Sequence, residues 1–214
     1  MLYADRAEAG RALARCLQGY AGRADAIVLG LARGGVPVAY EVARALRIPL
    51  DVFIVRKLGV PGQPEFAMGA IASGGVRVVN EDVLRRLGIS AQALEEVSAE
   101  QAAELRRRER LYRGQRPLPD LRGRTAIVVD DGLATGATMR ASAAALRRLQ
   151  PARIVAAVPV GAILACQAAN PDIDETVCLH TPEPFVGVGR WYGDFTQIDD
   201  EEVGRLLAQA AHAQ

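Results

Sequence analysis

The sequence predicts an α/β protein: an open, doubly wound, mainly parallel sheet with helices on both faces. Two observations carry this prediction. Short apolar runs, such as residues 26–31 and 125–132, alternate along the chain with amphipathic helical segments, as in parallel sheets whose strands are joined by helices. Glycine-rich turns directly follow both runs, where ligands bind in such sheets. We expect one domain over residues 1–214, with a helical insertion at about 81–116 and a small C-terminal segment.

The first third of the chain predicts a strand–helix–strand unit. Asp5 can cap a first helix that ends near residue 19. Residues 26–31 form a buried strand, residues 36–46 carry apolar side chains at helical spacing, and a second buried strand runs from Leu50 to about Leu58. Two strands joined by one helix predict parallel pairing with a right-handed crossover.

Residues 59–116 have a different character. Residues 59–66 contain two prolines and two glycines, and we expect a mobile loop followed by a strand or hairpin. Asn80 and Ser90 can each cap a helix. The second helix has only a narrow apolar stripe, which indicates that it is solvated or packs on a partner, and a homodimer is therefore left open.

Arginines gather at the end of this predicted helix. They could form a nucleic-acid patch, but the formal net charge of the whole chain is only +1, which favours another explanation. Cations near a helix C-terminus complement its dipole, and Glu104 can pair with Arg108 four residues later. The cluster comprises Arg106, Arg107, Arg108, Arg110 and Arg113.

The second half continues the alternation. Residues 125–132 form the clearest strand, and a helix over residues 137–149 follows it. Residues 153–161 and 175–180 supply two further strands. Asp199 and Glu202 resemble a capping box for a final helix over residues 200–211.

Composition narrows the class of protein. The near-zero net charge gives no electrostatic argument for nucleic acid or a membrane surface, and no apolar run is long enough to span a bilayer. Acids and arginines occupy the first residues, unlike a signal peptide. Cys16, Cys166 and Cys178 lack metal-ligand spacing, so we expect reduced thiols. These features predict a soluble, cytoplasmic protein.

Lys57 is the only lysine among 26 basic residues. A preference for arginine codons explains the arginines but not the exception. A compact ammonium can serve a site that a planar guanidinium does not fit. Chance is the competing explanation, and the neighbours of Lys57 must decide between the two.

Residues 130–138, "DDGLATGAT", carry the strongest chemical signal. The helix that follows offers free N–H groups and the positive end of its dipole, which together bind anions such as phosphate. Gly136 permits close approach, and Thr135 and Thr138 add hydroxyl donors. The lysine of a nucleotide-triphosphate loop and the glycine spacing of dinucleotide folds are both missing. Asp130 and Asp131 can accept hydrogen bonds from the hydroxyls of a phosphorylated sugar.

The stretch "IVVDDGLATGAT" resembles the 5-phosphoribosyl 1-diphosphate (PRPP) binding motif of the type I phosphoribosyltransferases. The stretch "LGLARGGVPVAYEVARAL" is similar to the diphosphate-binding loop and following helix of that family. The resemblance covers roughly residues 25–73 and 123–160. It implies transfer of the phosphoribosyl group from PRPP to a nitrogen acceptor, such as a nucleobase, with release of diphosphate.

The resemblance also implies roles for individual residues. Asp130 and Asp131 would hold the ribose hydroxyls, directly or through Mg²⁺, the implied cofactor. Arg33, Gly34 and Gly35 would bind the diphosphate. The positive charges of Arg56 and Lys57 would stabilise the negative charge of the diphosphate as it leaves. The loop that would hold the 5′-phosphate consists of Ala134, Thr135, Gly136, Ala137 and Thr138.

Recognition of the acceptor is less clear. Hypoxanthine-guanine members of the family carry an aspartate where this chain has Ala134, which disfavours that specificity and is closer to the adenine members. The family reads the base with a hood outside the core. The candidate hood, at about residues 180–198, holds the densest aromatic cluster: Phe185, Trp191, Tyr192 and Phe195. Trp191 could stack on a base, or the cluster could be a small satellite core.

Two rival functions remain at this point. A protein of this fold that senses PRPP or nucleotides without turning them over would carry the same motif. A phosphoester hydrolase could use the acid pair as metal ligands, but no Asp-x-Asp follows any of the predicted strands to serve as a nucleophile, and the chain has only two histidines.

Overall fold

The computed structural model describes residues 1–212 and contains two sheets. Five parallel strands form the larger sheet in the order β2-β1-β6-β7-β8. This arrangement confirms the predicted fold class. The strands are β1 (Ala26–Leu31), β2 (Leu50–Phe53), β6 (Thr125–Val129), β7 (Arg153–Val160) and β8 (Glu175–His180).

Helices cover both faces of this sheet. On one face, α1 (Arg6–Cys16) and α2 (Gly35–Leu46) pack on alternate residues of β1, β6 and β7. On the other face, α5 (Ala137–Arg148) packs on the intervening residues. The short α6 (Ile163–Gln167) lies beside β8, and α7 (Asp200–His212) packs against α2 and α4. Sealing both faces explains why the strands read as continuous apolar runs.

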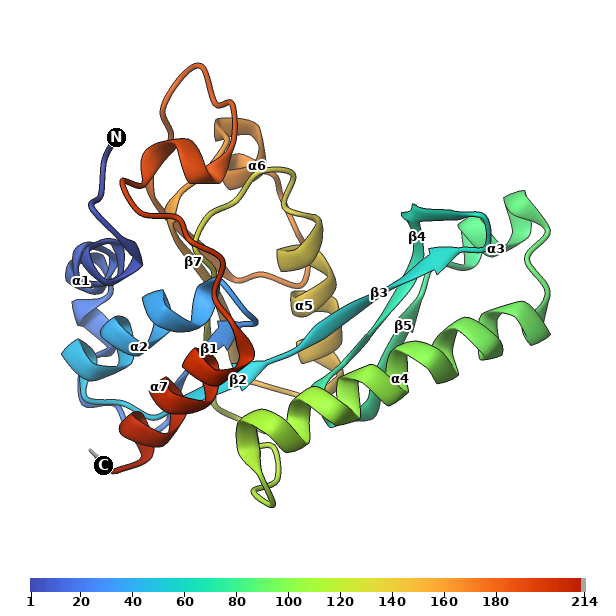
Figure 1. The fold of residues 1–214 in the computed structure, drawn as a ribbon, viewed down its shortest axis with the longest axis horizontal. Helices are drawn as coiled ribbons and strands as arrows, with labels where there is room; N and C mark the ends of the chain where they lie inside the picture. Colours follow the sequence, from blue (N-terminus) through green and yellow to red (C-terminus); the bar gives the residue numbers. More distant parts are fainter. Residues whose placement is uncertain (213–214) are drawn as a thin grey trace.

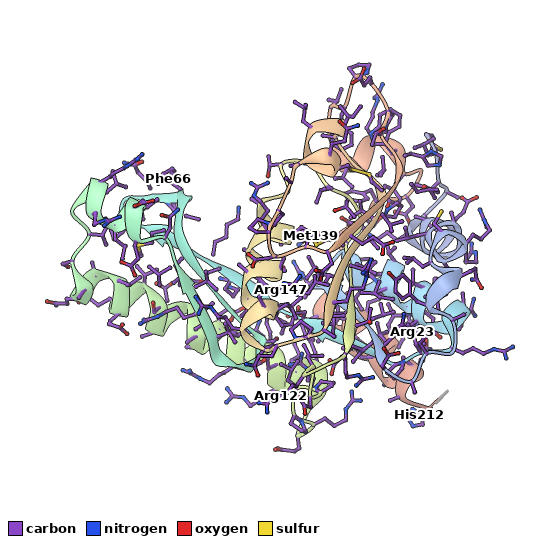
Figure 2. All side chains as sticks on the ribbon, turned by 180° about the vertical axis from the view of Figure 1, so that it is seen from behind. Arg23, Phe66, Arg122, Met139, Arg147 and His212 are labelled. Atoms are coloured by element: carbon purple, nitrogen blue, oxygen red, sulfur yellow. A yellow bond between two sulfur atoms is a disulfide. The ribbon has the colours of Figure 1, made fainter. Side chains whose placement is uncertain are left out.

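A second unit, which we call the arm, projects from the larger sheet (Figure 1). It contains an antiparallel sheet in the order β3-β4-β5 and two helices. Phe66 lies at its far end, away from the main body that contains Met139 (Figure 2). Its elements are β3 (Val55–Val60), β4 (Gln63–Ala72), β5 (Val76–Val79), α3 (Glu81–Leu87) and α4 (Ala91–Arg113).

The arm overturns two expectations. The predicted strand from Leu50 to Leu58 is two strands, because the chain leaves the parallel sheet at Ile54 and continues into the arm. Ser73 fixes this break: its hydroxyl accepts a hydrogen bond from the Ile54 amide at 3.1 Å. Residues 59–66 are not an irregular loop but the tip of the β3–β4 hairpin, which turns at residues 61–62 with Gly62 at φ +77°.

Several local predictions are confirmed. The side chains of Asp5, Asn80 and Ser90 cap α1, α3 and α4. Asp199 accepts a hydrogen bond from the Glu202 amide at 2.7 Å at the start of α7. Glu104 pairs with Arg108 at 2.7 Å, which supports the dipole and ion-pair explanation of the arginine cluster. The strand predicted over residues 125–132 ends earlier, at Val129.

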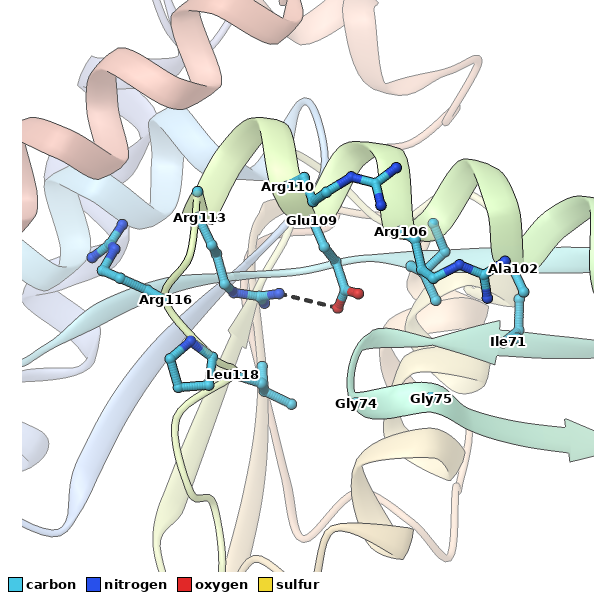
Figure 3. Close-up of a pocket in the computed structure, with 13 residues that line it drawn as sticks. Ile71, Gly74, Gly75, Ala102, Arg106, Glu109, Arg110, Arg113, Arg116 and Leu118 are labelled. Carbon is cyan, nitrogen blue, oxygen red and sulfur yellow. Dashed lines mark hydrogen bonds and ion pairs between the residues drawn. The ribbon is translucent and has the colours of Figure 1, made fainter.

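One buried arginine anchors the arm to the larger sheet. The Arg113 side chain, only 3% exposed, contacts Asp51 Oδ1 at 2.8 Å and Glu109 Oε1 at 3.1 Å, and donates to the carbonyl of Val52. It borders a cavity of about 430 Å³ between α4, the turn at residues 73–75 and residues 114–118 (Figure 3). This cavity lies at the base of the arm and has no residue in common with the acid pair or the phosphate loop.

The cysteines differ from expectation. Cys166 on α6 and Cys178 on β8 form a disulfide, and Cys16 is free. The packing of α6 beside β8 brings the two thiols together, and sequence spacing cannot reveal this proximity. Among residues 1–212, no helix is long and apolar enough to cross a membrane.

Candidate active site

The carboxyl ends of β1 and β6 lie side by side, because Gly30 pairs with Val129 in parallel register. Residues 32–35 follow β1, and residues 130–136 follow β6. The structure thus brings together two of the three predicted loops at the edge of the sheet where open α/β folds bind ligands.

Asp130 and Asp131 form a half-buried acid pair. The Asp131 amide donates to Asp130 Oδ1 at 2.9 Å, and Arg6 Nε donates to Asp131 Oδ2 at 2.9 Å. Burial raises the pKa of both carboxyls, and the charge of Asp131 raises the pKa of Asp130 further. Arg6 opposes the rise at Asp131. Two desolvated carboxylates side by side repel each other, so the pair is suited to bind hydroxyl donors or a cation.

Gly34 and Gly35 lie directly against this pair. A Cβ added to Gly34 would collide with the Asp131 carboxylate, and one added to Gly35 would lie 2.5 Å from the Val129 carbonyl. These positions require glycine because no side chain fits between the loop and the acids. The loop after β1 and the acid pair therefore form one continuous surface. The Ala32–Arg33 peptide bond in this loop is cis.

The candidate phosphate loop leads from the acid pair to α5. Leu133 is fixed to the end of β7 by hydrogen bonds with Val160 and Ala162, at 2.9 and 2.8 Å. Gly136 adopts φ +74° as the N-cap residue of α5, a left-handed conformation that favours glycine. The helix begins at Ala137, whose N–H donates to Thr135 Oγ1 at 3.4 Å, and the next N–H groups of its first turn are available to an anion. In Figure 1 this loop is the trace that leads into α5.

Arg56 and Lys57 reach the site from a different element than predicted. They lie on β3 of the arm, not at the carboxyl end of a strand in the parallel sheet. Both line a cleft of about 670 Å³ that also includes Ala32 of the loop after β1 and Thr138 of α5. Arg56 donates twice to Gln101 Oε1, at 2.9 and 2.7 Å, while Lys57 is exposed. Arg56 and Lys57 therefore lie on the same cleft as the loop after β1 and the start of α5.

Arg33 has a partner that the sequence did not indicate. Its guanidinium lies 3.7 Å from Asp200 Oδ1 at the start of α7. The Tyr112 hydroxyl also donates to Asp200, and this hydrogen bond lowers the pKa of the Asp200 carboxyl. Asp200 consequently links the loop after β1 to α4 of the arm.

The candidate hood lies over the acid pair, and its aromatic residues have different surroundings. The Tyr192 hydroxyl donates to the backbone carbonyl of Asp131 at 2.5 Å, and Val188 packs on Gly132. Trp191 packs instead in a small apolar cluster with Tyr3, and its buried indole N–H has no hydrogen-bond partner among the described residues. Base stacking by Trp191 stays a prediction, and its surroundings match the satellite-core alternative.

Three arginines at the site were not predicted from the sequence. Arg6 contacts the acid pair, Arg108 lines the cleft, and Arg140 Nη1 donates to the Thr135 carbonyl at 2.8 Å. Only Arg140 could have been found from sequence, because it lies four residues after Gly136 at the start of the same helix. Arg6 and Arg108 come from segments that are distant in the chain.

The parallel sheet carries the acid pair and the candidate phosphate loop at the edge where open α/β folds bind ligands. A family model for the phosphoribosyl transferase domain matches residues 2–189. The chain belongs to the phosphoribosyl transferase family, which confirms the resemblance drawn from its motifs.

Individual proteins that are similar to this chain include two solved structures and one curated relative. A crystal structure of a Thermus thermophilus protein is similar over 98% of this chain and 99% of that chain, with 43% identity and a TM-score of 0.84. A Mycobacterium tuberculosis protein, provisionally named a phosphoribosyl transferase, is 50% identical over 212 residues. The match covers 98% of this chain but 47% of that relative, so the chain spans about half its length. A Neisseria gonorrhoeae protein, crystallised with ppGpp, shares the fold at 18% identity and a TM-score of 0.52.

Proposed function

We propose that this protein is a Mg²⁺-dependent phosphoribosyltransferase that transfers the 5-phosphoribosyl group from PRPP to a nitrogen acceptor, with release of diphosphate. The observation that carries the proposal is the half-buried acid pair between two loops whose backbone N–H groups are suited to bind anions. Gly34 and Gly35 adjoin it on one side, and the phosphate loop of residues 134–138 continues from it on the other. PRPP has the same order of groups: a diphosphate, two ribose hydroxyls and a 5′-phosphate.

Each part of the site has a role in this reaction. The acid pair accepts hydrogen bonds from the ribose hydroxyls, and residues 134–138 hold the 5′-phosphate. Arg33 and the backbone of Gly34 and Gly35 bind the diphosphate, which leaves C1 as positive charge develops on the sugar ring. Arg56 and Lys57 face the cleft and stabilise the negative charge that grows on the leaving group, an effect worth several kcal/mol in comparable sites.

The residues present fit Mg²⁺. Burial raises the pKa of both Asp130 and Asp131, and the charge of Asp131 raises the pKa of Asp130 further, whereas a bound cation would favour the charged carboxylates. No cluster of three or more acidic, histidine or cysteine ligands occurs among residues 1–212. This matches the preference of Mg²⁺ for one or two carboxylates together with substrate phosphates. Bound there, the ion would neutralise charge on the diphosphate.

We assign two further tasks to the tip of the β3–β4 hairpin and to the hood. The tip of the β3–β4 hairpin, residues 59–66, borders the cleft through Gly59, Pro61 and Gly62. In this proposal the tip covers PRPP and excludes water during transfer. The hood, residues 180–198, would face the acceptor base, and Ala134 disfavours hypoxanthine-guanine specificity.

Incubation with PRPP, Mg²⁺ and a panel of nucleobases and amines, following diphosphate release, tests this function. We expect one acceptor to accelerate release well above the rate with PRPP alone, and chelation of divalent metal to abolish that acceleration. Tight PRPP binding with no acceptor-dependent release would instead identify a PRPP-sensing protein. Failure to bind PRPP at all would overturn the proposal.

A further inference from the structure

The Arg6 side chain occupies an unusual place for a cation. Arg6 is the first residue of α1, and its side chain is only 9% exposed. The N-terminus of a helix is the positive end of the helix dipole, where a buried cation is disfavoured. Stability alone does not explain an arginine here, so its partners indicate what it does.

Those partners belong to the acid pair and the hood. Arg6 Nε donates to Asp131 Oδ2 at 2.9 Å, and Arg6 Nη1 donates to the Thr196 carbonyl at 2.9 Å. The guanidinium lies 3.9 Å from the centre of the Phe195 ring, a cation–π arrangement. The Arg6 side chain therefore joins Asp131 to two residues of the hood.

The N-terminal segment ties the hood down in the same place. The amides of Leu2 and Tyr3 donate to the Trp191 carbonyl, and those of Gly193 and Asp194 donate to the carbonyls of Tyr3 and Ala4. These bonds hold the hood to the start of α1, whichever residue occupies position 6. Arg6 adds the only side-chain hydrogen bond from α1 to Asp131 within the described residues.

The two oxygens of the Asp131 carboxylate have different surroundings. Arg6 engages Oδ2 of Asp131, whereas Oδ1 has no side-chain partner among the described residues. The fork of the guanidinium fixes the rotation of the carboxylate because the same fork is held by Thr196. A fixed carboxylate presents one oxygen to the ligand at a constant angle.

We propose that Arg6 is a positioning residue: it orients Asp131 for a ribose hydroxyl and latches the hood onto it, so that hood closure and ribose binding are coupled. This rests on the proposed function, since the ribose hydroxyls belong to PRPP. Lysine cannot replace arginine fully, because one ammonium lacks the planar fork that reaches both Asp131 and Thr196.

Three variants separate this role from a purely structural ion pair. Arg6→Met removes the charge and the fork, Arg6→Lys keeps the charge alone, and Arg15→Met on the exposed side of α1 is the matched control. Without ligand, hydrogen exchange of residues 194–198 reports the latch. Binding of PRPP with Mg²⁺, of ribose 5-phosphate and of inorganic diphosphate reports the site.

We expect Arg6→Met to speed exchange of residues 194–198 and to weaken PRPP and ribose 5-phosphate binding about tenfold or more, about 1.4 kcal/mol. Diphosphate binding should stay within about twofold of the parent, because Arg6 contacts neither anion loop. Arg6→Lys should recover most of the affinity but not the slow exchange. Arg15→Met should match the parent in every readout.

Unchanged hood exchange in Arg6→Met would overturn the latch. Equal loss of diphosphate and ribose 5-phosphate binding would overturn the positioning role and indicate general loss of structure, as would full recovery of both readouts by Arg6→Lys. If the parent protein binds neither PRPP nor ribose 5-phosphate, the proposed function fails. Because the ligand-free exchange comparison does not depend on PRPP, it still tests the latch by itself.

Discussion

The parallel sheet and the arm differ in how completely their elements are buried. Every residue of β1 and β6 is buried, and helices seal both faces of that sheet. In the arm, β5 and α3 contain no fully buried residue. The apolar core of the arm lies between β3, β4 and α4 and includes Leu58, Met68 and Leu105. Polar contacts lie around this core, such as Arg56 with Gln101 and Arg77 with Glu95 at 2.6 Å.

The proposed site has one part on each of these two units. The acid pair and the phosphate loop rise from the sealed sheet, which fixes their geometry. Lys57 and Arg56 stand on the arm, where local opening costs less free energy. We therefore expect the sheet to set what binds and the arm to control how the leaving group is stabilised. The predictions below test this division, beginning with the largest expected effect.

Arg113 anchors the arm, so Arg113→Met should have the largest effect on stability. The substitution leaves Asp51 buried without its cation, and we expect the free energy of unfolding to fall by about 3 to 5 kcal/mol. Urea unfolding measures the change. Arg110→Met, exposed on the same helix, is the control. Matching midpoints for the two variants would show that Arg113 does not anchor the arm.

Gly34 tests the sealed half of the site. In Gly34→Ala the new methyl group meets the Asp131 carboxylate. We expect PRPP affinity to fall about a hundredfold, about 2.8 kcal/mol, with little loss of stability. Gly19→Ala is the control, because nothing lies within 4 Å of a Cβ there. Undiminished affinity in Gly34→Ala would separate this loop from the acid pair.

Lys57 tests the arm. Lys57→Arg keeps the charge but replaces a compact ammonium with a planar fork. We expect the rate of acceptor-dependent diphosphate release to fall by about tenfold, about 1.4 kcal/mol in the barrier, and PRPP affinity to change less. The control is Arg86→Lys, an exposed change on α3. A fully active Lys57→Arg variant would make the lone lysine an accident of composition.

Trp191 gives the smallest expected signal and tests the hood. It is the only tryptophan, so its emission has one source. We expect a nucleoside 5′-monophosphate to change the emission more than ribose 5-phosphate, which lacks the base. Identical responses would mean that Trp191 reports only loop closure. No response at saturating ligand would assign its cluster to a satellite core.

The sequence predicted those features whose determinants are contiguous. Residues 130–138 carry the acids, the left-handed glycine and the helix start in one stretch, so the core of the site was visible. The break at Ile54 was not, because the apolar run continues through Phe53, Ile54 and Val55 without a turn residue. Arg6 was missed because 125 residues separate it from Asp131. Contacts of that range depend on how α1 packs, which periodicity alone does not determine.

Asp131 offers the most direct test of the central claim that the acid pair binds the ribose of PRPP. Asp131→Asn keeps the size of the side chain and an oxygen that can still accept from Arg6, so the fold should persist. Calorimetric titration with PRPP and Mg²⁺ should show an affinity at least about tenfold lower than in the parent, about 1.4 kcal/mol. Asp82→Asn, an exposed change on α3, should bind like the parent. Equal affinity in Asp131→Asn and the parent would contradict the claim.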